Sequence, residues 1–214
     1  MSSVFHVNLT IECTAPTGAT VRLDGAASSD PDGDPISFNW SGLFGTVTGV
    51  SPAVTLPLGT STINLAVTDT YGGTGTSSMS ATVQDKTAPS ATLTLTPNVL
   101  WSPNHKLVPI AASITTSDLC DPSPKVSLDS ITSNQPDSGL DKSDVPGDIQ
   151  NATFGTDDRA FLVRAERAGI PANGLTDAQI KLGRTYTVTY SVTDRSGNST
   201  RVSGTVTVPY SQRP

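Results

Sequence analysis

The chain has 214 residues, of which 35% are hydrophobic, 5% aromatic and 15% charged, and its net charge is −6. This length suits two domains of ordinary size. An acidic surface without a cluster of Lys and Arg repels phosphate backbones, so nucleic acid is excluded as a partner and anionic membranes are disfavoured. No window approaches 18 consecutive apolar residues, so membrane insertion is not expected.

The start of the chain, M-S-S-V-F-H, lacks a basic region followed by an apolar stretch, so no targeting signal is expected there. A strand-like pattern follows Met1 at once. This indicates a piece excised from a longer extracellular protein, secreted or held at the cell surface, whose other domains are its first expected partners.

The acidic residues are almost all aspartates: 17 Asp stand against two glutamates, Glu12 and Glu166. Aspartate favours turns and binds hard cations through its oxygens. This bias therefore predicts loops that bind Ca²⁺.

The pattern of alternating Thr and Val segments, broken by Gly, Pro and Asp, predicts an all-β fold with two tandem immunoglobulin-like β-sandwiches. The boundary falls in V-Q-D-K-T-A-P, where Pro89 removes a donor and disfavours the helical conformation of Ala88. We predict domains at 1–85 and 86–214. Each ends on a Val-Thr-Asp turn, at Asp69 and Asp194, which indicates a duplicated architecture.

In the first domain we expect strands at Val4–Ile11, Thr20–Leu23, Ile36–Trp40, Val54–Leu58, Thr62–Thr68 and Thr76–Val83. Trp40 is expected in the core, as in other sandwiches, rather than as a platform for a sugar.

The segments L-D-G-A-A-S-S-D-P-D-G-D-P-I-S-F-N-W and V-T-D-T-Y-G-G resemble the PKD-type immunoglobulin-like domain of bacterial secreted enzymes and surface proteins, over about residues 7 to 85. After Trp40 the chain departs from that pattern, because W-S-G-L-F-G replaces the usual W-D-F-G-D-G. Any function of that family's loop is therefore not carried over.

In the second domain we expect strands at Thr92–Thr96, Leu107–Thr116, Lys125–Thr132, Ala160–Arg167, Thr185–Thr193 and Thr200–Val208. A long acidic loop spans 134–158. A short helix is predicted over 176–182, with Thr176 as N-cap, Gln179 closing a capping box and Gly183 ending it. The phrases D-L-C-D-P, V-R-A-E-R and V-T-D-R-S-G-N resemble bacterial Ig-like repeats related to HYR modules.

Sandwich topology predicts two groups of oxygen ligands for calcium, because turns at one end of a sandwich meet there. The first is in domain 1 and consists of Asp30, Asp32, Asp34 and Asp69. The second lies near the hinge and consists of Asp85, Asp118, Asp121, Asp194 and Asn198. The alternative is that each aspartate only closes its own turn.

The long loop offers a third group of carboxylates: Asp137, Asp141, Asp144, Asp148, Asp157 and Asp158. Its spacing is not that of an EF-hand, which needs a central Gly and a closing Glu. The alternative to calcium is a solvated acidic loop.

Cys13 and Cys120 are the only cysteines, and the predicted topology places both near the hinge. In an extracellular protein they can form an interdomain disulfide. Two free, half-buried thiols are the alternative.

No catalytic residues are predicted. His6 and His105 fall in separate domains, and no H-E-x-x-H, G-x-S-x-G or Gly-rich phosphate loop is present. His105 is expected to pack or form a hydrogen bond near Trp101.

The sequence therefore favours a non-catalytic, calcium-binding spacer or interaction segment. An alternative is a carbohydrate-binding accessory module of a polysaccharide-degrading enzyme, which would need aromatics in a row. Trp101, Tyr71 and Tyr210 are its candidates. Adhesion to another cell-surface protein, including a second copy, is a third possibility.

Overall fold

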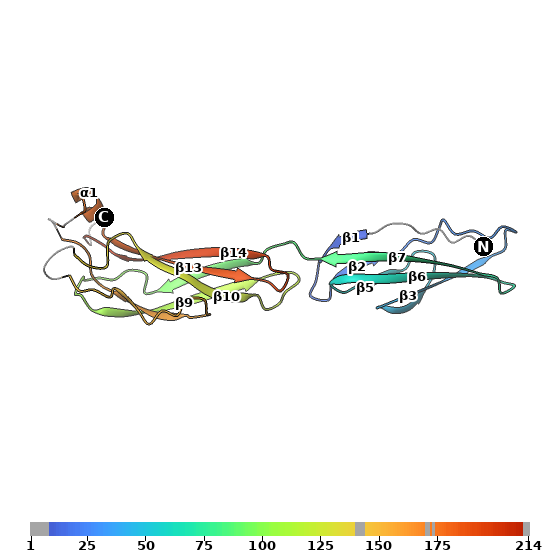
Figure 1. Ribbon diagram of the computed structural model, residues 1–214, viewed down its shortest axis with the longest axis horizontal. Coiled ribbons are helices and arrows are strands. Elements are labelled where there is room, and N and C mark those ends of the chain that lie inside the picture. The colour runs from blue at the N-terminus through green and yellow to red at the C-terminus, as the bar shows by residue number, and fades with distance from the viewer. Residues whose placement is uncertain (1–8, 140–143, 170–171, 173, 212–214) are drawn as a thin grey trace. The chain divides into compact units, whose positions relative to one another are not determined.

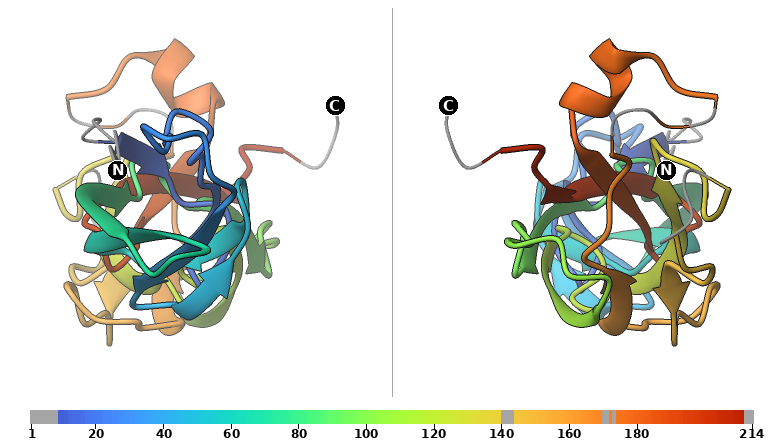
Figure 2. Two further views of the ribbon diagram at one scale, coloured as in Figure 1. Left: turned by 90° about the vertical axis from the view of Figure 1, so that its right-hand side faces the viewer. Right: turned by 90° about the vertical axis from the view of Figure 1, so that its left-hand side faces the viewer.

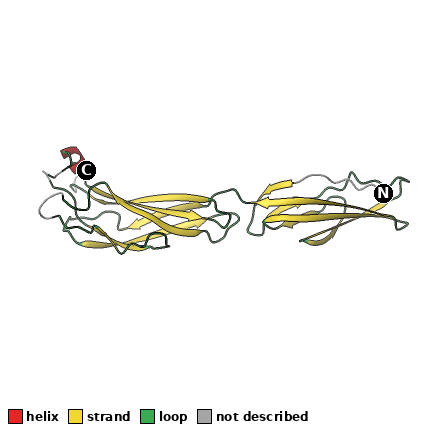
Figure 3. Cartoon of the chain, in the orientation of Figure 1, coloured by secondary structure: helices red, strands yellow, loops and turns green. Residues whose placement is uncertain are grey.

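The computed structural model describes residues 9–139, 144–169, 172 and 174–211 (Figure 1). Within them the chain forms two compact units. The first contains residues 9–87 and 119–122, and the second contains 88–118 and 123–211. The chain therefore passes between the units three times. Almost all of the regular structure is β-strand, as Figure 3 shows.

The first unit is an immunoglobulin-like sandwich of two sheets. A five-stranded sheet has the order β1-β7-β6-β3-β4, and a two-stranded sheet pairs β2 with β5. This is the arrangement of the larger sheet in variable-type domains, with an extra strand beside β3. The strands are β1 (Leu9–Glu12), β2 (Ala19–Arg22), β3 (Ile36–Gly42), β4 (Gly45–Thr48), β5 (Ala53–Leu56), β6 (Gly59–Asp69) and β7 (Thr74–Gln84).

Trp40 of β3 lies at the centre of this core, as expected from the sequence, and is 0% exposed. Alternate residues of β6 and β7 point inward with it, among them Leu65 and Met79. The indole Nε1 donates to the Gly49 carbonyl oxygen at 2.9 Å, so the one polar atom of the ring is satisfied.

Gly18, in the turn before β2, is required by its surroundings. Its φ is +115°, and a Cβ placed there would lie 1.8 Å from the Leu56 carbonyl oxygen. Only glycine lets the backbone pass so close to β5.

The second unit has the constant-type arrangement, with a four-stranded sheet in the order β11-β12-β9-β8 facing a three-stranded sheet in the order β10-β13-β14. Its core contains Phe161, Tyr186 and Tyr190. The elements are β8 (Ser90–Thr96), β9 (Leu107–Ser117), β10 (Lys125–Ser133), β11 (Ile149–Gln150), β12 (Ala160–Arg164), α1 (Asp177–Lys181), β13 (Arg184–Thr193) and β14 (Ser199–Val208).

The helix α1 has the predicted capping box. The Thr176 hydroxyl accepts from the Gln179 amide N–H at 3.3 Å, and the Gln179 Oε1 accepts from the Thr176 amide N–H at 2.9 Å. Gly183 follows the C-cap with φ +74°. Figure 2 shows α1 outside the sheets. No helix among the described residues has the length and apolar character needed to cross a membrane.

The predicted strands are present, apart from the part of Val4–Ile11 that lies outside the described residues. The sequence did not indicate β4, and it treated β11 as part of the long loop. Both are short edge strands, at four and two residues.

Candidate functional site

Two of the predicted calcium ligands of the first unit, Asp30 and Asp69, close their own turns. The Asp30 Oδ1 accepts from the amides of Asp32 and Asp34 at 2.8 and 3.3 Å. The Asp69 Oδ1 accepts from the amides of Tyr71 and Gly73 at 2.7 and 2.9 Å. These are the local hydrogen bonds that favour aspartate in turns.

Within the described part of either unit, no three acidic, histidine or cysteine side chains have ligand atoms within 4.8 Å of one another. The structure therefore does not gather Asp30, Asp32, Asp34 and Asp69 into one site.

The second predicted group draws on both units. Asp85 and Asp121 belong to the first unit and are 8% and 2% exposed. Asp118, Asp194 and Asn198 belong to the second. The Asp194 Oδ1 accepts from the Asn198 amide N–H at 2.9 Å, and its Oδ2 accepts from the Asn198 side-chain amide at 2.8 Å. Calcium binding by this group stays a prediction.

The described carboxylates of the long loop hold protein groups. Asp137 accepts from the amides of Gly147 and Asp148 at 2.9 and 2.6 Å. Asp148 forms ion pairs with Arg184 and Arg164, and Asp157 forms one with Arg159. Asp158 accepts from the Thr153 and Ala160 amides. Asp141 lies outside the described residues.

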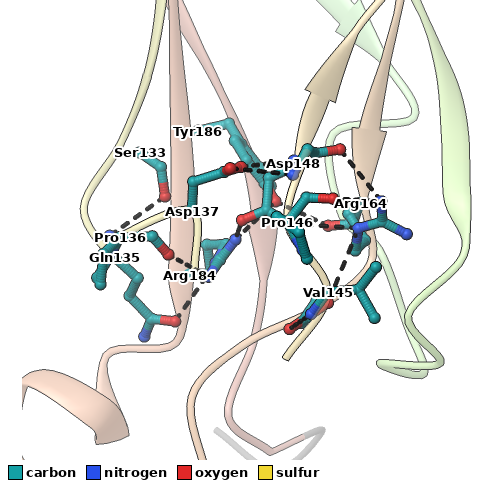
Figure 4. Close-up of polar contacts among 12 residues, drawn as sticks. Ser133, Gln135, Pro136, Asp137, Val145, Pro146, Asp148, Arg164, Arg184 and Tyr186 are labelled. Atoms are coloured by element: carbon teal, nitrogen blue, oxygen red, sulfur yellow. Dashed lines mark hydrogen bonds and ion pairs between the residues drawn. The ribbon is translucent and has the colours of Figure 1, made fainter. Parts of the chain in front are cut away.

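Among the described residues, a buried polar network in the second unit is the most developed site (Figure 4). Arg184 begins β13 on its inward face and is 0% exposed, and Asp148 beside it is 1% exposed. The guanidinium of Arg184 also donates to the Pro136 carbonyl oxygen at 2.9 Å and to the Tyr186 hydroxyl at 3.2 Å. Charges can be buried in this way because they are paired and hydrogen-bonded.

Arg164, at the end of β12, connects the same network to the loop. Its Nε lies 3.4 Å from the Asp148 Oδ1, and its terminal nitrogens donate to carbonyl oxygens of His105, Pro146 and Gly147 at 2.8 to 3.3 Å. Together the two arginines bind the segment 146–148 to the sandwich, as Figure 4 shows. These loop residues are thus held by guanidinium groups, which is a structural alternative to the predicted cation.

Glu166 completes the network and is 2% exposed. Its Oε2 lies 3.1 Å from the His105 Nδ1, and its Oε1 accepts from the Val145 amide at 3.2 Å. Burial raises the pKa of Glu166 above its ordinary value, a hydrogen bond with Asp144 acts in the same direction, and His105 opposes them. His105 thus contacts a buried acid, which the sequence did not suggest; the expectation of a contact near Trp101 missed this partner.

Cys13 and Cys120 are joined by a disulfide with a Cα–Cα distance of 6.1 Å. Both cysteines belong to the first unit, because Cys120 lies in the four-residue segment 119–122 that clusters with it. The expectation of an interdomain bond placed Cys120 in the second domain.

No protein-family model matches the chain, and no curated protein matches it. Solved structures do. One is a nucleoside hydrolase-related hypothetical protein from Saccharophagus degradans that is associated with carbohydrate metabolism; it is 28% identical over 36% of this chain and 22% of that one, with a TM-score of 0.30.

Two others cover more of the chain. The fibronectin(III)-like modules of Clostridium thermocellum CbhA are 12% identical over 94% of this chain and 90% of that one, with a TM-score of 0.32. A bacterial ice-binding adhesin of 1.5 MDa is 15% identical over 94% of this chain and 60% of that one, with a TM-score of 0.35. At these scores the likeness does not extend beyond the class of fold.

Proposed function

We propose that this chain is a non-catalytic spacer and interaction segment of a longer secreted or cell-surface bacterial protein. The observation that carries this proposal is the direction of the chain through each unit. In the first unit β1 pairs in parallel with β7, the last strand, and in the second Val99 pairs in parallel with Thr207 of β14.

Parallel neighbours run from the same pole of a sheet to the same opposite pole. In the second unit the chain therefore enters at Ser90, the start of β8, which pairs with Ser117 at the end of β9. It leaves at the opposite pole after Val208, the end of β14, which pairs with Arg184 at the start of β13. A unit threaded from pole to pole lengthens the protein. With ten residues in β14, the gain is about 33 Å at the usual rise of a strand.

The spacer role is tested by replacement in the parent protein. Exchange of residues 9–208 for an unrelated pair of β-sandwiches of equal length is expected to preserve the function of the flanking segments. Loss of that function, with both replacement domains folded, would show that this chain carries an activity of its own.

The disulfide supports a secreted or cell-surface location, because such bonds persist in oxidising compartments. The intact protein purified from the periplasm or culture medium is expected to gain no alkyl groups unless it is first reduced and unfolded. Alkylation of the unreduced protein at both cysteines would contradict this location.

Calcium remains part of the proposal through the aspartates near the end of the first unit. Asp85 and Asp121 are buried carboxylates, so they offer oxygen atoms of the kind that hard cations prefer. Ca²⁺ accepts six to eight oxygen ligands from loops without strict geometry. Magnesium would demand an octahedral site.

A carbohydrate-binding accessory role is the second candidate, because of a hollow of about 580 Å³ on the outer face of β3, β6 and β7. Its side chains offer neutral amides and hydroxyls, which donate and accept as sugar hydroxyls do. None of the described residues that line it is charged. The polar ones include Asn39, Ser41, Asn64, Thr76 and Ser78.

Native gel electrophoresis through hydroxyethylcellulose, glucomannan or dextran tests this candidate. Retardation that Asn39→Ala/Asn64→Ala abolishes would support it. The matched control is Thr60→Ala/Thr82→Ala, which removes a 2.9 Å hydroxyl pair elsewhere on the same sheet. Equal mobility with and without polysaccharide would reject it.

A further inference from the structure

The disulfide encloses most of the first unit in a covalent loop. Cys13 follows β1 directly, and its partner is 107 positions further along the chain, so 106 residues lie between them. These residues, 14–119, contain every strand from β2 to β9. Of the first unit's seven strands, only β1 lies outside the loop.

A tension applied to the two ends of a chain follows the shortest covalent path. Here that path runs to Cys13, crosses the sulfur–sulfur bond and continues from Cys120. The residues of the loop are left without load once β1 has been drawn away from β7. A spacer anchored at both ends is subject to such tension, so this reasoning rests on the proposed function.

We propose that the Cys13–Cys120 disulfide is a covalent load path that shields the first sandwich from tension. The hydrogen bonds of β2–β7 can then survive forces that unfold the second unit, whose strands β10–β14 remain in the loaded path. The sulfurs themselves are protected, since Cys13 and Cys120 are 3% and 6% exposed. A thiol reductant must therefore reach a buried bond.

Reduction of this bond follows a defined chemical step and releases a defined length of chain. A thiolate of dithiothreitol attacks one sulfur and displaces the other, and its second thiol then releases the mixed disulfide. The chain gains two electrons and two protons as two thiols, and the reagent leaves as a cyclic disulfide. The 106 freed residues add about 350–380 Å of extensible length.

Single-molecule force spectroscopy of the full chain between two reference domains tests this proposal. The oxidised protein is expected to extend without residues 14–119, and Cys13→Ser/Cys120→Ser is expected to extend about 350–380 Å further. In a second measurement, which does not require the variant to fold, the oxidised protein is pulled and held in dithiothreitol. An additional step of the same length, at a rate that rises with reagent concentration, is then expected.

If the oxidised chain releases its full length without reductant, the load path does not exist. This readout measures length alone, so it is independent of the replacement experiment that tests the spacer role. If the replacement experiment abolishes function while force spectroscopy gives the expected extensions, the spacer role is rejected and the load path through the disulfide is retained.

Discussion

The buried Arg184 yields a sharp prediction about stability. Arg184→Met keeps most of the side-chain volume but removes the charge, so Asp148 loses its nearest counter-charge and keeps Arg164, whose Nε lies 3.4 Å away. Removal of one partner of a buried ion pair costs about 3–5 kcal/mol. We expect the free energy of unfolding of the second unit to fall by about that amount.

A matched control is Arg201→Met. Arg201 also pairs with an aspartate, Asp129, at 3.0 Å, but its side chain is 77% exposed. Exposed pairs contribute about 0–1 kcal/mol, so this variant should be nearly as stable as the wild type. Replacement of both partners, Arg184→Met/Asp148→Leu, should recover part of the loss, because the Arg164 Nε still has the Glu166 Oε2 3.8 Å away as a counter-charge.

Urea unfolding followed by hydrogen exchange and mass spectrometry is the assay, because peptides from β13 report on the second unit and peptides from β6 on the first. The loss should be confined to the second unit. A destabilisation by Arg184→Met no larger than that of Arg201→Met would refute the reasoning.

The two glutamates should give opposite pH dependences. The pKa of Glu166 is raised in the folded protein, so its contribution to stability is complete below its pKa in the unfolded chain and is lost as pH rises through the folded pKa. Glu166→Gln should therefore reduce the fall of stability with rising pH and stabilise the second unit at neutral pH. The pKa of Glu12 is lowered in the folded protein, first by a hydrogen bond from the Lys86 amide N–H. Its contribution to stability is therefore present above its pKa in the unfolded chain and lost on acidification, and Glu12→Gln should remove it. Melting temperatures measured between pH 3 and 8 would show both effects. The same dependence of melting temperature on pH in the two variants would contradict these predictions. Gly18→Ala should destabilise the first unit by more than Gly33→Ala, where φ is +81° but nothing lies within 4 Å of the added Cβ; equal midpoints in urea would oppose this. Finally, protein shown by elemental analysis to contain calcium should melt at a lower temperature in EDTA, and an unchanged midpoint would remove calcium from the proposal.

The strands and the helix α1 were predictable because their signals are local. Alternation along ten residues decides which face of β13 or β14 is buried, and the Thr176–Gln179 capping box needs only four consecutive residues. The position of Trp40 in the core was predictable in the same way. Short edge strands such as β4 carry too few residues for alternation to appear.

The candidate site was not predictable to the same degree because it depends on contacts between distant segments. Asp30 and Asp69 each found backbone donors within four residues, and local partners of that kind compete with a shared cation. One signal for the network was available. Arg184 stands on the inward face of its strand, in phase with Tyr186, and an arginine in that position requires a buried acid.

The strands at the borders of the sheets limit association between copies of this protein. Unpaired backbone groups on a long, flat border strand invite another molecule to add its own strand. Here β1 and β4 have four residues each, and β11 has two.

The longer border strands are β10 and β14. Strand β10 is interrupted by an irregularity between Leu128 and Ser130 and begins with Lys125. On β14, the Thr207 N–H is already taken by the Asn98 carbonyl oxygen. These features disfavour the addition of a strand from another copy at these borders.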